Sequence, residues 1–447
     1  MMDEFKSMMN LTRSLSFQER ARKRVPGMSQ LFSKRPEMFS LGVWPGYFSR
    51  AKGARIWDLD DNEYLDMSIA GMGANVLGYA DPDVDGVVCE AISRGTSSSL
   101  NCPEEVELAE LLCELHPWAE MARFARTGGE AMAIAVRIAR AHTGREKIAF
   151  CGYHGWHDWY LAANLENENA LGEHLLSGLP PAGVPQGLAR TAFPFRYNRI
   201  EDLKAIVSSH GRDLAAIVME PIRNHYPDSG FLEAVRDIAH DLKAVWILDE
   251  ISSGFRLTCG GAHRVLTAAN PDMAVFSKAL GNGYPIAAVI GRAEVIEAAQ
   301  QSFISSTLWT ERVGPAAALA TIRKHGACSV ADHLQRLGTL VQRGWQELAA
   351  RHGLAIETGG IPPLSHFSFL GDNTGTWKAY FVQQMLARRI LASTLFYPMW
   401  AHTEEDVALY LKATDQSFAE LASAVSRGTV RSELYGKPAR SGFQRLT

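Results

Sequence analysis

Three segments in the middle of the chain carry residues that could do chemistry, and each directly follows a short apolar run. Thr127-Gly128-Gly129 opens a helical pattern, Asp249 ends an apolar run, and Lys278 precedes a glycine-rich turn. Backbone N–H groups at the start of a helix attract phosphate, and glycines let the phosphate approach closely. A buried carboxylate needs a cationic or hydrogen-bonding partner. A desolvated lysine amine is a nucleophile for an aldehyde. The set predicts a site for a phosphorylated aldehyde with a cationic group.

Three more residues fall at predicted strand ends. Tyr153 supplies a flat ring that can stack on a conjugated molecule, and His154 follows it. Glu220 ends another apolar run, and its buried carboxylate, like that of Asp249, needs a cationic or hydrogen-bonding partner. His154 and His157 lack the spacing of helical metal ligands and have no distant third ligand, so we predict no metal site. Each of these residues taken alone also has a non-functional explanation: the lysine could be a surface amine, and the glycines could form an ordinary turn. Only their occurrence together, in the order glycine loop, aromatic residue, aspartate and lysine, favours a binding site.

The elements that must position these residues alternate between strands and helices. A 3.6-residue apolar period from Ala131 to Ala139 predicts a helix after the glycine pair. Near-continuously apolar strands separated by helices indicate a mostly parallel sheet covered on both faces. In such sheets ligands bind at the carboxyl ends of the strands, where the candidate residues fall. The predicted buried strands are residues 123–126, 147–151, 215–219, 245–248 and 273–276.

The two ends of the chain have other patterns. Residues 55–67 predict a hairpin with its turn at 60–62, and Ser16 to Glu19 predict a capping box that opens a basic helix ending at Pro26-Gly27. Residues 403–406 precede a helix over 407–424. The basic tail from Arg427 has little apolar content, so we expect it to be poorly ordered or to pack on a partner subunit.

Composition excludes several classes of protein. The net charge of −4 is not that of a nucleic-acid binder. No stretch of about 20 apolar residues predicts a membrane span, and charges interrupt the first 24 residues, so we expect no signal peptide. The six cysteines form no CxxC pair, which favours reduced thiols in a cytoplasmic protein. A length of 447 residues predicts a large core with a second, smaller unit.

These motifs together resemble the class III, fold-type I pyridoxal 5′-phosphate (PLP) aminotransferases, and most closely the branch similar to glutamate-1-semialdehyde aminomutase. The resemblance runs from about residue 17 to about residue 420 and includes several motifs in the family's order. The matching segments are residues 19–27, 50–66, 78–82, 126–148, 153–155, 249–256, 277–285, 305–315 and 401–406.

The resemblance implies a fold, a cofactor and the roles of individual residues. It implies a large PLP-binding domain (70–325) with a mostly parallel seven-stranded sheet flanked by helices. Residues 1–69 would join a smaller α+β domain that includes 326–447 and the basic tail. Lys278 matches the lysine that holds PLP as a Schiff base, and Asp249 matches the partner of the pyridine nitrogen. Tyr153 matches the aromatic residue on the ring. Thr307 resembles the threonine that reaches the phosphate in the neighbouring subunit, which implies a homodimer with shared active sites.

The chain also departs from the family pattern at three places. Gly129 stands at or beside a position that usually bears a hydroxyl, so the phosphate contacts would come from backbone and Thr127. Leu308-Trp309-Thr310 replaces small residues. Residues 393–400 lack the acidic residue that aminomutases carry near the substrate.

The expected activity is therefore transfer of an amino group from an amino-acid donor to a carbonyl acceptor by a ping-pong mechanism. A sugar or other ring-bearing ketone or aldehyde is one candidate acceptor, because tryptophans could widen the pocket. The alternative is an aminomutase, racemase or decarboxylase on the same fold. The tryptophans in question are Trp44, Trp156, Trp159, Trp309 and Trp400, and the candidates for binding a substrate carboxylate are Arg256, Arg223 and Arg35.

Overall fold

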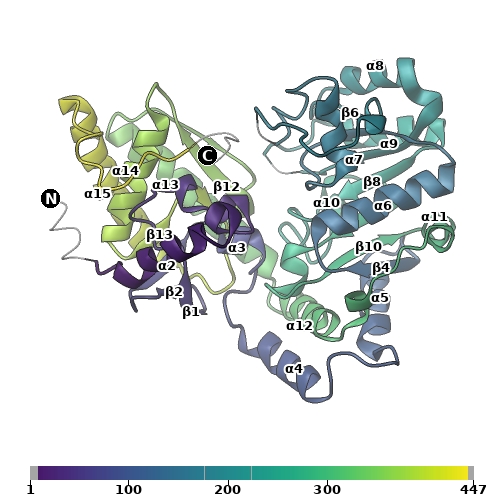
Figure 1. Cartoon of the computed structure of the whole chain (residues 1–447), viewed down its shortest axis with the longest axis horizontal. Coiled ribbons are helices and arrows are strands. Elements are labelled where there is room, and N and C mark those ends of the chain that lie inside the picture. Colours follow the sequence, from purple (N-terminus) through teal and green to yellow (C-terminus); the bar gives the residue numbers. More distant parts are fainter. Residues whose placement is uncertain (1–8, 176, 223, 441–447) are drawn as a thin grey trace. The chain divides into compact units, whose positions relative to one another are not determined.

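The structure is a computed structural model that describes residues 9–175, 177–222 and 224–440 (Figure 1). Its residues divide into two units, one of residues 82–332 and one of residues 9–81 and 333–440. The boundaries expected from the sequence, 69/70 and 325/326, remain predictions. No helix among the described residues is long and apolar enough to cross a membrane.

The unit of residues 82–332 is built around a seven-stranded sheet. Only β10 runs antiparallel to its neighbours, so the predicted mostly parallel sheet is confirmed. All five strands expected from the sequence are present, with ends shifted by at most two residues. Two more, β6 and β10, were not expected. In spatial order the strands are β4 (Met121–Ala125), β10 (Ala287–Gly291), β9 (Met273–Phe276), β8 (Val245–Asp249), β7 (Leu214–Met219), β5 (Lys147–Cys151) and β6 (Ala192–Pro194).

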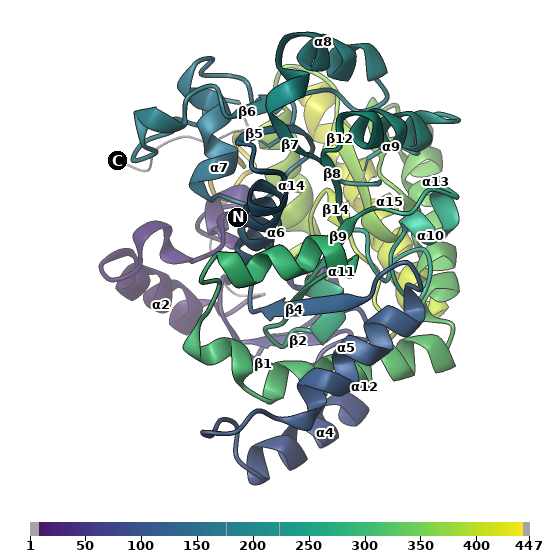
Figure 2. The ribbon, with the colours of Figure 1, turned by 90° about the vertical axis from the view of Figure 1, so that its right-hand side faces the viewer.

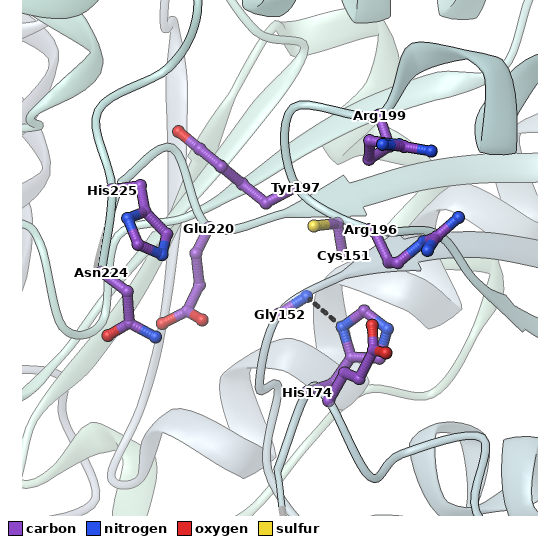
Figure 3. A pocket seen from close by; sticks show the side chains of 10 residues that line it. Cys151, Gly152, His174, Arg196, Tyr197, Arg199, Glu220, Asn224 and His225 are labelled. Atoms are coloured by element: carbon purple, nitrogen blue, oxygen red, sulfur yellow. Dashed lines mark hydrogen bonds between the residues drawn. The ribbon is translucent and has the colours of Figure 1, made fainter. Parts of the chain in front are cut away.

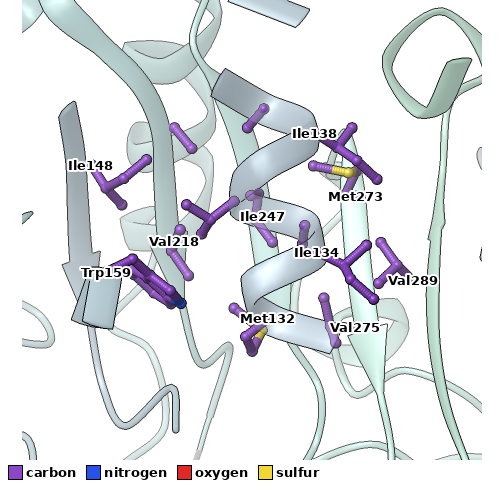
Figure 4. Close-up of a cluster of buried hydrophobic side chains, with 14 of the residues drawn as sticks. Met132, Ile134, Ile138, Ile148, Trp159, Val218, Ile247, Met273, Val275 and Val289 are labelled. Atoms are coloured by element: carbon purple, nitrogen blue, oxygen red, sulfur yellow. The ribbon is translucent and has the colours of Figure 1, made fainter. Parts of the chain in front are cut away.

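Helix α6 (Gly128–Thr143) packs across this sheet and forms the centre of its core (Figure 4). Its apolar face carries Met132, Ile134 and Ile138, which lie against residues of the strands such as Ile247 and Val275. Because strands β7, β8 and β9 are buried along their whole length, only their ends can present polar groups. The sheet therefore fixes where Asp249 and Lys278 stand.

Further helices cover the rest of the sheet. Helix α9 (Phe231–Leu242) contacts β7 and β8. Helices α4 (Pro82–Ser93), α5 (Pro103–Leu115) and α12 (Val313–Ala327) pack together beside β4, at the bottom of Figure 2. The predicted α/β class with helices flanking the sheet is confirmed.

The other unit is a smaller α+β assembly made from both ends of the chain. One sheet has the order β1-β2-β3-β13 and the other β11-β12-β14. The predicted hairpin is confirmed as β2 and β3. The elements are β1 (Phe48–Lys52), β2 (Arg55–Asp58), β3 (Glu63–Met67), β11 (Ile356–Gly359), β12 (Ser365–Phe369), α14 (Thr374–Ala387), β13 (Ile390–Ala392), β14 (Leu395–Phe396), α15 (Glu404–Arg427) and most of α13 (Val330–Arg351).

The expected start of the first helix is wrong, and the basic tail is ordered up to residue 440, while its packing on a partner subunit stays a prediction. Helix α2 (Thr12–Arg22) begins before Ser16, because the carboxylate of Asp60 accepts the N–H groups of Arg13 and Ser14 at 2.7 and 2.8 Å. A remote carboxylate thus replaces the expected capping box. The tail up to residue 440 packs on its own unit, since Ala439 N–H donates to the Gly375 carbonyl and Val430 is buried. Residues 441–447 lie outside the described residues.

Candidate active site

Lys278 and Asp249 lie at the carboxyl ends of two neighbouring parallel strands. Asp249 ends β8 and pairs with Val275 of β9, and Lys278 follows β9 after one residue. Lys278 Nζ donates a hydrogen bond of 2.7 Å to Ser252 Oγ, three residues beyond Asp249. The Lys278 backbone has a φ of +47°, a left-handed conformation that costs on the order of 1–3 kcal/mol for a side chain with a Cβ. The surrounding packing holds this strained turn at the site.

The carboxylate of Asp249 is buried, with 2% of the residue exposed, and it has two partners. Oδ1 accepts the Ile251 N–H at 3.0 Å, and Oδ2 lies 2.7 Å from His154 Nδ1. His154 Nε2 lies 3.1 Å from the Cys151 carbonyl oxygen. Because a carbonyl oxygen only accepts, His154 Nε2 is the donor in this contact. His154 and the Ile251 N–H thus hold the Asp249 carboxylate in place, and the carboxylate retains lone pairs for another donor.

The N-terminus of α6 lies beside this pair. Thr127 is the N-cap, and the Glu130 carboxylate accepts the N–H groups of Arg126 and Thr127 at 2.9 and 3.3 Å. A Cβ added to Gly128 would come within 2.8 Å of the Ile251 side chain. The glycine therefore lets the helix start pack against the loop that follows Asp249. The first N–H groups of a helix have no partner within the helix, so they are available to an anion.

Tyr153 and Glu220 form the other side of the site. Tyr153 N–H donates to Glu220 Oε2 at 3.1 Å, which ties the loop after β5 to the end of β7. Glu220 also lines a cavity of about 420 Å³ with Cys151, Gly152 and His174 (Figure 3). His174 Nδ1 accepts the Gly152 N–H at 3.3 Å, and burial lowers the pKa of His174. The imidazole next to this cavity is therefore neutral.

The structure brings most of the candidate residues together. Lys278, Asp249 and His154 meet at the ends of β5, β8 and β9, next to Gly128 and Gly129. Thr307 lies on the exposed turn η9 (Thr307–Thr310), and its expected contact with a neighbouring subunit stays a prediction. Among the described residues no three His, Cys, Asp or Glu side chains are grouped as metal ligands.

Ser252, Ile251, His157 and Arg126 were not recognised as site residues from the sequence. Ser252 and Ile251 stand within three residues of Asp249, and that proximity is the one signal that could have indicated them. Their contacts with Lys278 and Gly128 depend on the register of β8 against β9 and on how α6 packs, which no local pattern specifies.

The remaining candidates take different positions. Arg256 is 1% exposed in the unit that holds the site, Arg35 belongs to the smaller unit, and Arg223 lies outside the described residues. Trp159 is a core residue at 5% exposure, whereas Trp156 is 69% exposed. Trp309 packs on the core of the larger unit, and Trp44 and Trp400 belong to the smaller unit.

Arg126 connects the start of α6 to the segment that carries Thr307. Its Nη2 donates to the carbonyl oxygens of Trp309 and Glu311 at 2.9 and 3.0 Å, and its Nε lies 3.0 Å from Glu311 Oε1. The Glu311 carboxylate also accepts the N–H groups of Val313 and Gly314, which caps α12. One guanidinium thus joins the residue before Thr127 to the segment that leads from Thr307 into α12.

We expect Arg126→Gln to lower the free energy of unfolding by about 2–3 kcal/mol, because charged hydrogen bonds are lost and Glu311 is left partly buried without its partner. Urea denaturation measures the change. The matched control is Arg190→Gln, since Arg190 and Glu166 form an exposed pair in the same unit. That variant should leave the free energy of unfolding almost unchanged, because solvent screens an exposed pair. Equal losses of stability in the two variants would show that the contacts of Arg126 with Trp309 and Glu311 stabilise the fold no more than an exposed ion pair does.

Comparisons with known proteins agree with this geometry. The aminotransferase class-III family model matches residues 42–358, and the chain therefore belongs to the class III aminotransferases. The 3-aminobutyryl-CoA aminotransferase of Cloacimonas acidaminovorans is 33% identical over 92% of this chain and 98% of its own length. The 2′-deamino-2′-hydroxyneamine transaminase of Streptomyces kanamyceticus is 31% identical over 86% of this chain and 91% of its own length.

Solved structures show the same fold. The PLP form of FumI from Sphingopyxis sp. MTA144 has a TM-score of 0.84 and 25% identity, covering 96% of this chain and 99% of its own. A glutamate-1-semialdehyde aminomutase of Pseudomonas aeruginosa PAO1 has a TM-score of 0.78 at 19% identity, covering 94% and 96%, and this likeness concerns the fold alone. The predicted family, fold-type I architecture and aminotransferase activity are confirmed, and class III aminotransferases use PLP.

Proposed function

We propose that this aminotransferase binds PLP in the unit of residues 82–332, with Lys278 as the residue that links to it covalently. The observation that carries the proposal is the meeting of Lys278 Nζ, Ser252 Oγ and the buried Asp249 at two adjacent strand ends. A reactive amine and a buried carboxylate with a free lone pair suit an aldehyde that is joined to a protonated pyridine ring.

The other candidate residues fit the remaining parts of PLP. The N-terminus of α6, with Thr127, Gly128 and Gly129, would hold the phosphate. Tyr153 would cover the ring, while Glu220 fixes the backbone of Tyr153 and His154 fixes the carboxylate of Asp249. When bound, PLP stores the amino group between the two half-reactions and draws electrons from the reacting carbon.

The chain's own residues then handle one proton. In the first half of the transfer, Lys278 Nζ would take a proton from the donor carbon that bears the amino group and deliver it to the cofactor carbon that receives this group, and in the second half it would move a proton in the opposite direction. Ser252 Oγ accepts a hydrogen bond from that amine and keeps it near Asp249. Asp249, whose Oδ2 lies 2.7 Å from His154 Nδ1, would accept a hydrogen bond from the ring nitrogen of the cofactor and keep that nitrogen protonated.

The names of the two relatives support a substrate class. By name, one acts on 3-aminobutyryl-CoA, which carries its amino group at carbon 3 of a CoA thioester, and the other acts on 2′-deamino-2′-hydroxyneamine. We infer that one of the two substrates of this enzyme has its amino or carbonyl group on a carbon that is not adjacent to a carboxylate, and a ring-bearing ketone is a candidate. The alternative is an aminomutase, racemase or decarboxylase reaction at the same residues.

Two further features belong to the proposal. The exposed positions of Thr307 and Leu308 support a homodimer in which this segment reaches the partner's phosphate site. The six free cysteines support a cytoplasmic location.

A single-turnover experiment tests the proposed reaction. Incubation of the holoenzyme with an amino donor and no acceptor should release one equivalent of carbonyl product per subunit and then stop. Addition of a carbonyl acceptor should restart turnover. A racemase would release no carbonyl product, and a decarboxylase would release carbon dioxide continuously. Either of those results would contradict the transaminase assignment.

A further inference from the structure

The imidazole of His157 stands against the first turn of α6. A Cβ added to Gly129 would lie 3.1 Å from His157 Nδ1 and 3.2 Å from its Cε1. The loop reaches this position because Gly155, with a φ of +97°, packs directly on Gly129, and a Cβ on Gly155 would lie 2.9 Å from the Gly129 Cα. His157 therefore fills the space beside a helix residue that has no side chain of its own.

The Nδ1 atom of His157 is shielded from solvent but has no hydrogen-bond partner among the described residues. Two buried histidines of the same unit differ, although the Nδ1 atom of a third, His325, also has no partner among the described residues. His116 pairs with the Leu112 carbonyl and the Gly261 N–H, and His263 pairs with Glu250 and Trp118. An unsatisfied buried polar atom is costly, so a ligand that pairs with it gains affinity.

The ring is also held in place and kept neutral. Trp156 stacks on it with centroids 4.7 Å apart and planes 28° apart. Burial lowers the pKa of His157, although Glu130 and Asp158 act in the opposite direction. A neutral imidazole with its proton on Nδ1 is a hydrogen-bond donor directed at the start of α6.

We propose that His157 Nδ1 donates a hydrogen bond to the phosphate of the cofactor at the N-terminus of α6, in the place of a side-chain donor at position 129. The inference rests on the proposed function, which places the phosphate there. It adds a positioning residue that the chain supplies from a different loop, and it explains why Gly129 is small: a side chain at 129 would crowd the imidazole.

Binding of PLP and of pyridoxal, which lacks the phosphate, to the apoenzyme separates this role from a structural one. In His157→Ala we expect the Kd for PLP to rise about tenfold or more, because a hydrogen bond to a charged group is lost. The Kd for pyridoxal should be unchanged. The control is His142→Ala, on the exposed last turn of the same helix, which should alter neither value.

A second substitution distinguishes a lost hydrogen bond from a loss of stability in His157→Ala. In Gly129→Ser/His157→Ala, the new hydroxyl has room and should restore much of the affinity for PLP. Gly129→Ser alone should not raise affinity, because its Cβ meets the ring. The inference is overturned if His157→Ala binds PLP as the wild type does, if PLP and pyridoxal weaken equally, or if the serine restores nothing. A wild-type apoenzyme that binds PLP no better than pyridoxal would instead contradict the proposed phosphate site itself.

Discussion

Lys278→Ala is expected to reduce turnover by roughly 10⁴-fold or more, because one amine both forms the covalent link to PLP and moves the proton. The visible absorption of the bound cofactor should also change, since the linkage is lost. Steady-state kinetics and the absorption spectrum of the purified variant measure both effects. The structure supports a specific role for this lysine because its amine is held by Ser252 beside Asp249.

The control for this substitution is Lys204→Ala. Lys204 lies on α8 (Ile200–His210) of the same unit and forms an exposed pair with Glu201, so its loss should leave turnover unchanged. Lys278→Ala should still unfold cooperatively, because the left-handed backbone at residue 278 is no worse for alanine than for lysine. Wild-type turnover in Lys278→Ala would refute the central assignment.

Asp249→Asn is expected to lower kcat by about 10³-fold with a small effect on KM for the donor. The amide has nearly the same shape but no charge, so it cannot keep a ring nitrogen protonated. The side chain at this position also faces His154, whose Nδ1 lies 2.7 Å from Asp249 Oδ2. Kinetics of the first half-reaction would isolate the loss, because that step depends on electron withdrawal by the ring.

A matched control stands at the opposite end of the same strands. Asp272 accepts the Trp246 N–H at 2.9 Å near the amino end of β8, so it is another carboxylate that supports this strand. Asp272→Asn should lower the free energy of unfolding by about 1 kcal/mol and leave kcat almost unchanged. If both variants lost kcat equally, Asp249 would act only by supporting the sheet.

The sequence predicted the elements of the larger unit well, because buried parallel strands are apolar throughout and that composition is visible locally. Two strands of this sheet were not predicted, each because of a local feature of its sequence. Strand β6 is three residues long and ends in Pro194, and β10 follows the glycine-rich turn after Lys278. The start of α2 was misplaced because Asp60, 46 residues from Ser14, caps it. Such a cap is a tertiary contact.

By itself, the sequence determined which residue types carry the chemistry: an amine, a carboxylate, an aromatic ring and a glycine-flanked helix start, each after an apolar strand. Only the tertiary structure decided how they meet. The register of β8 and β9 places Lys278 beside Ser252, and the packing of two loops on α6 places Ile251 and His157 against the glycines. The physical reason is that strand ends are specified by local apolar runs, whereas contacts between loops depend on side chains distant in the chain.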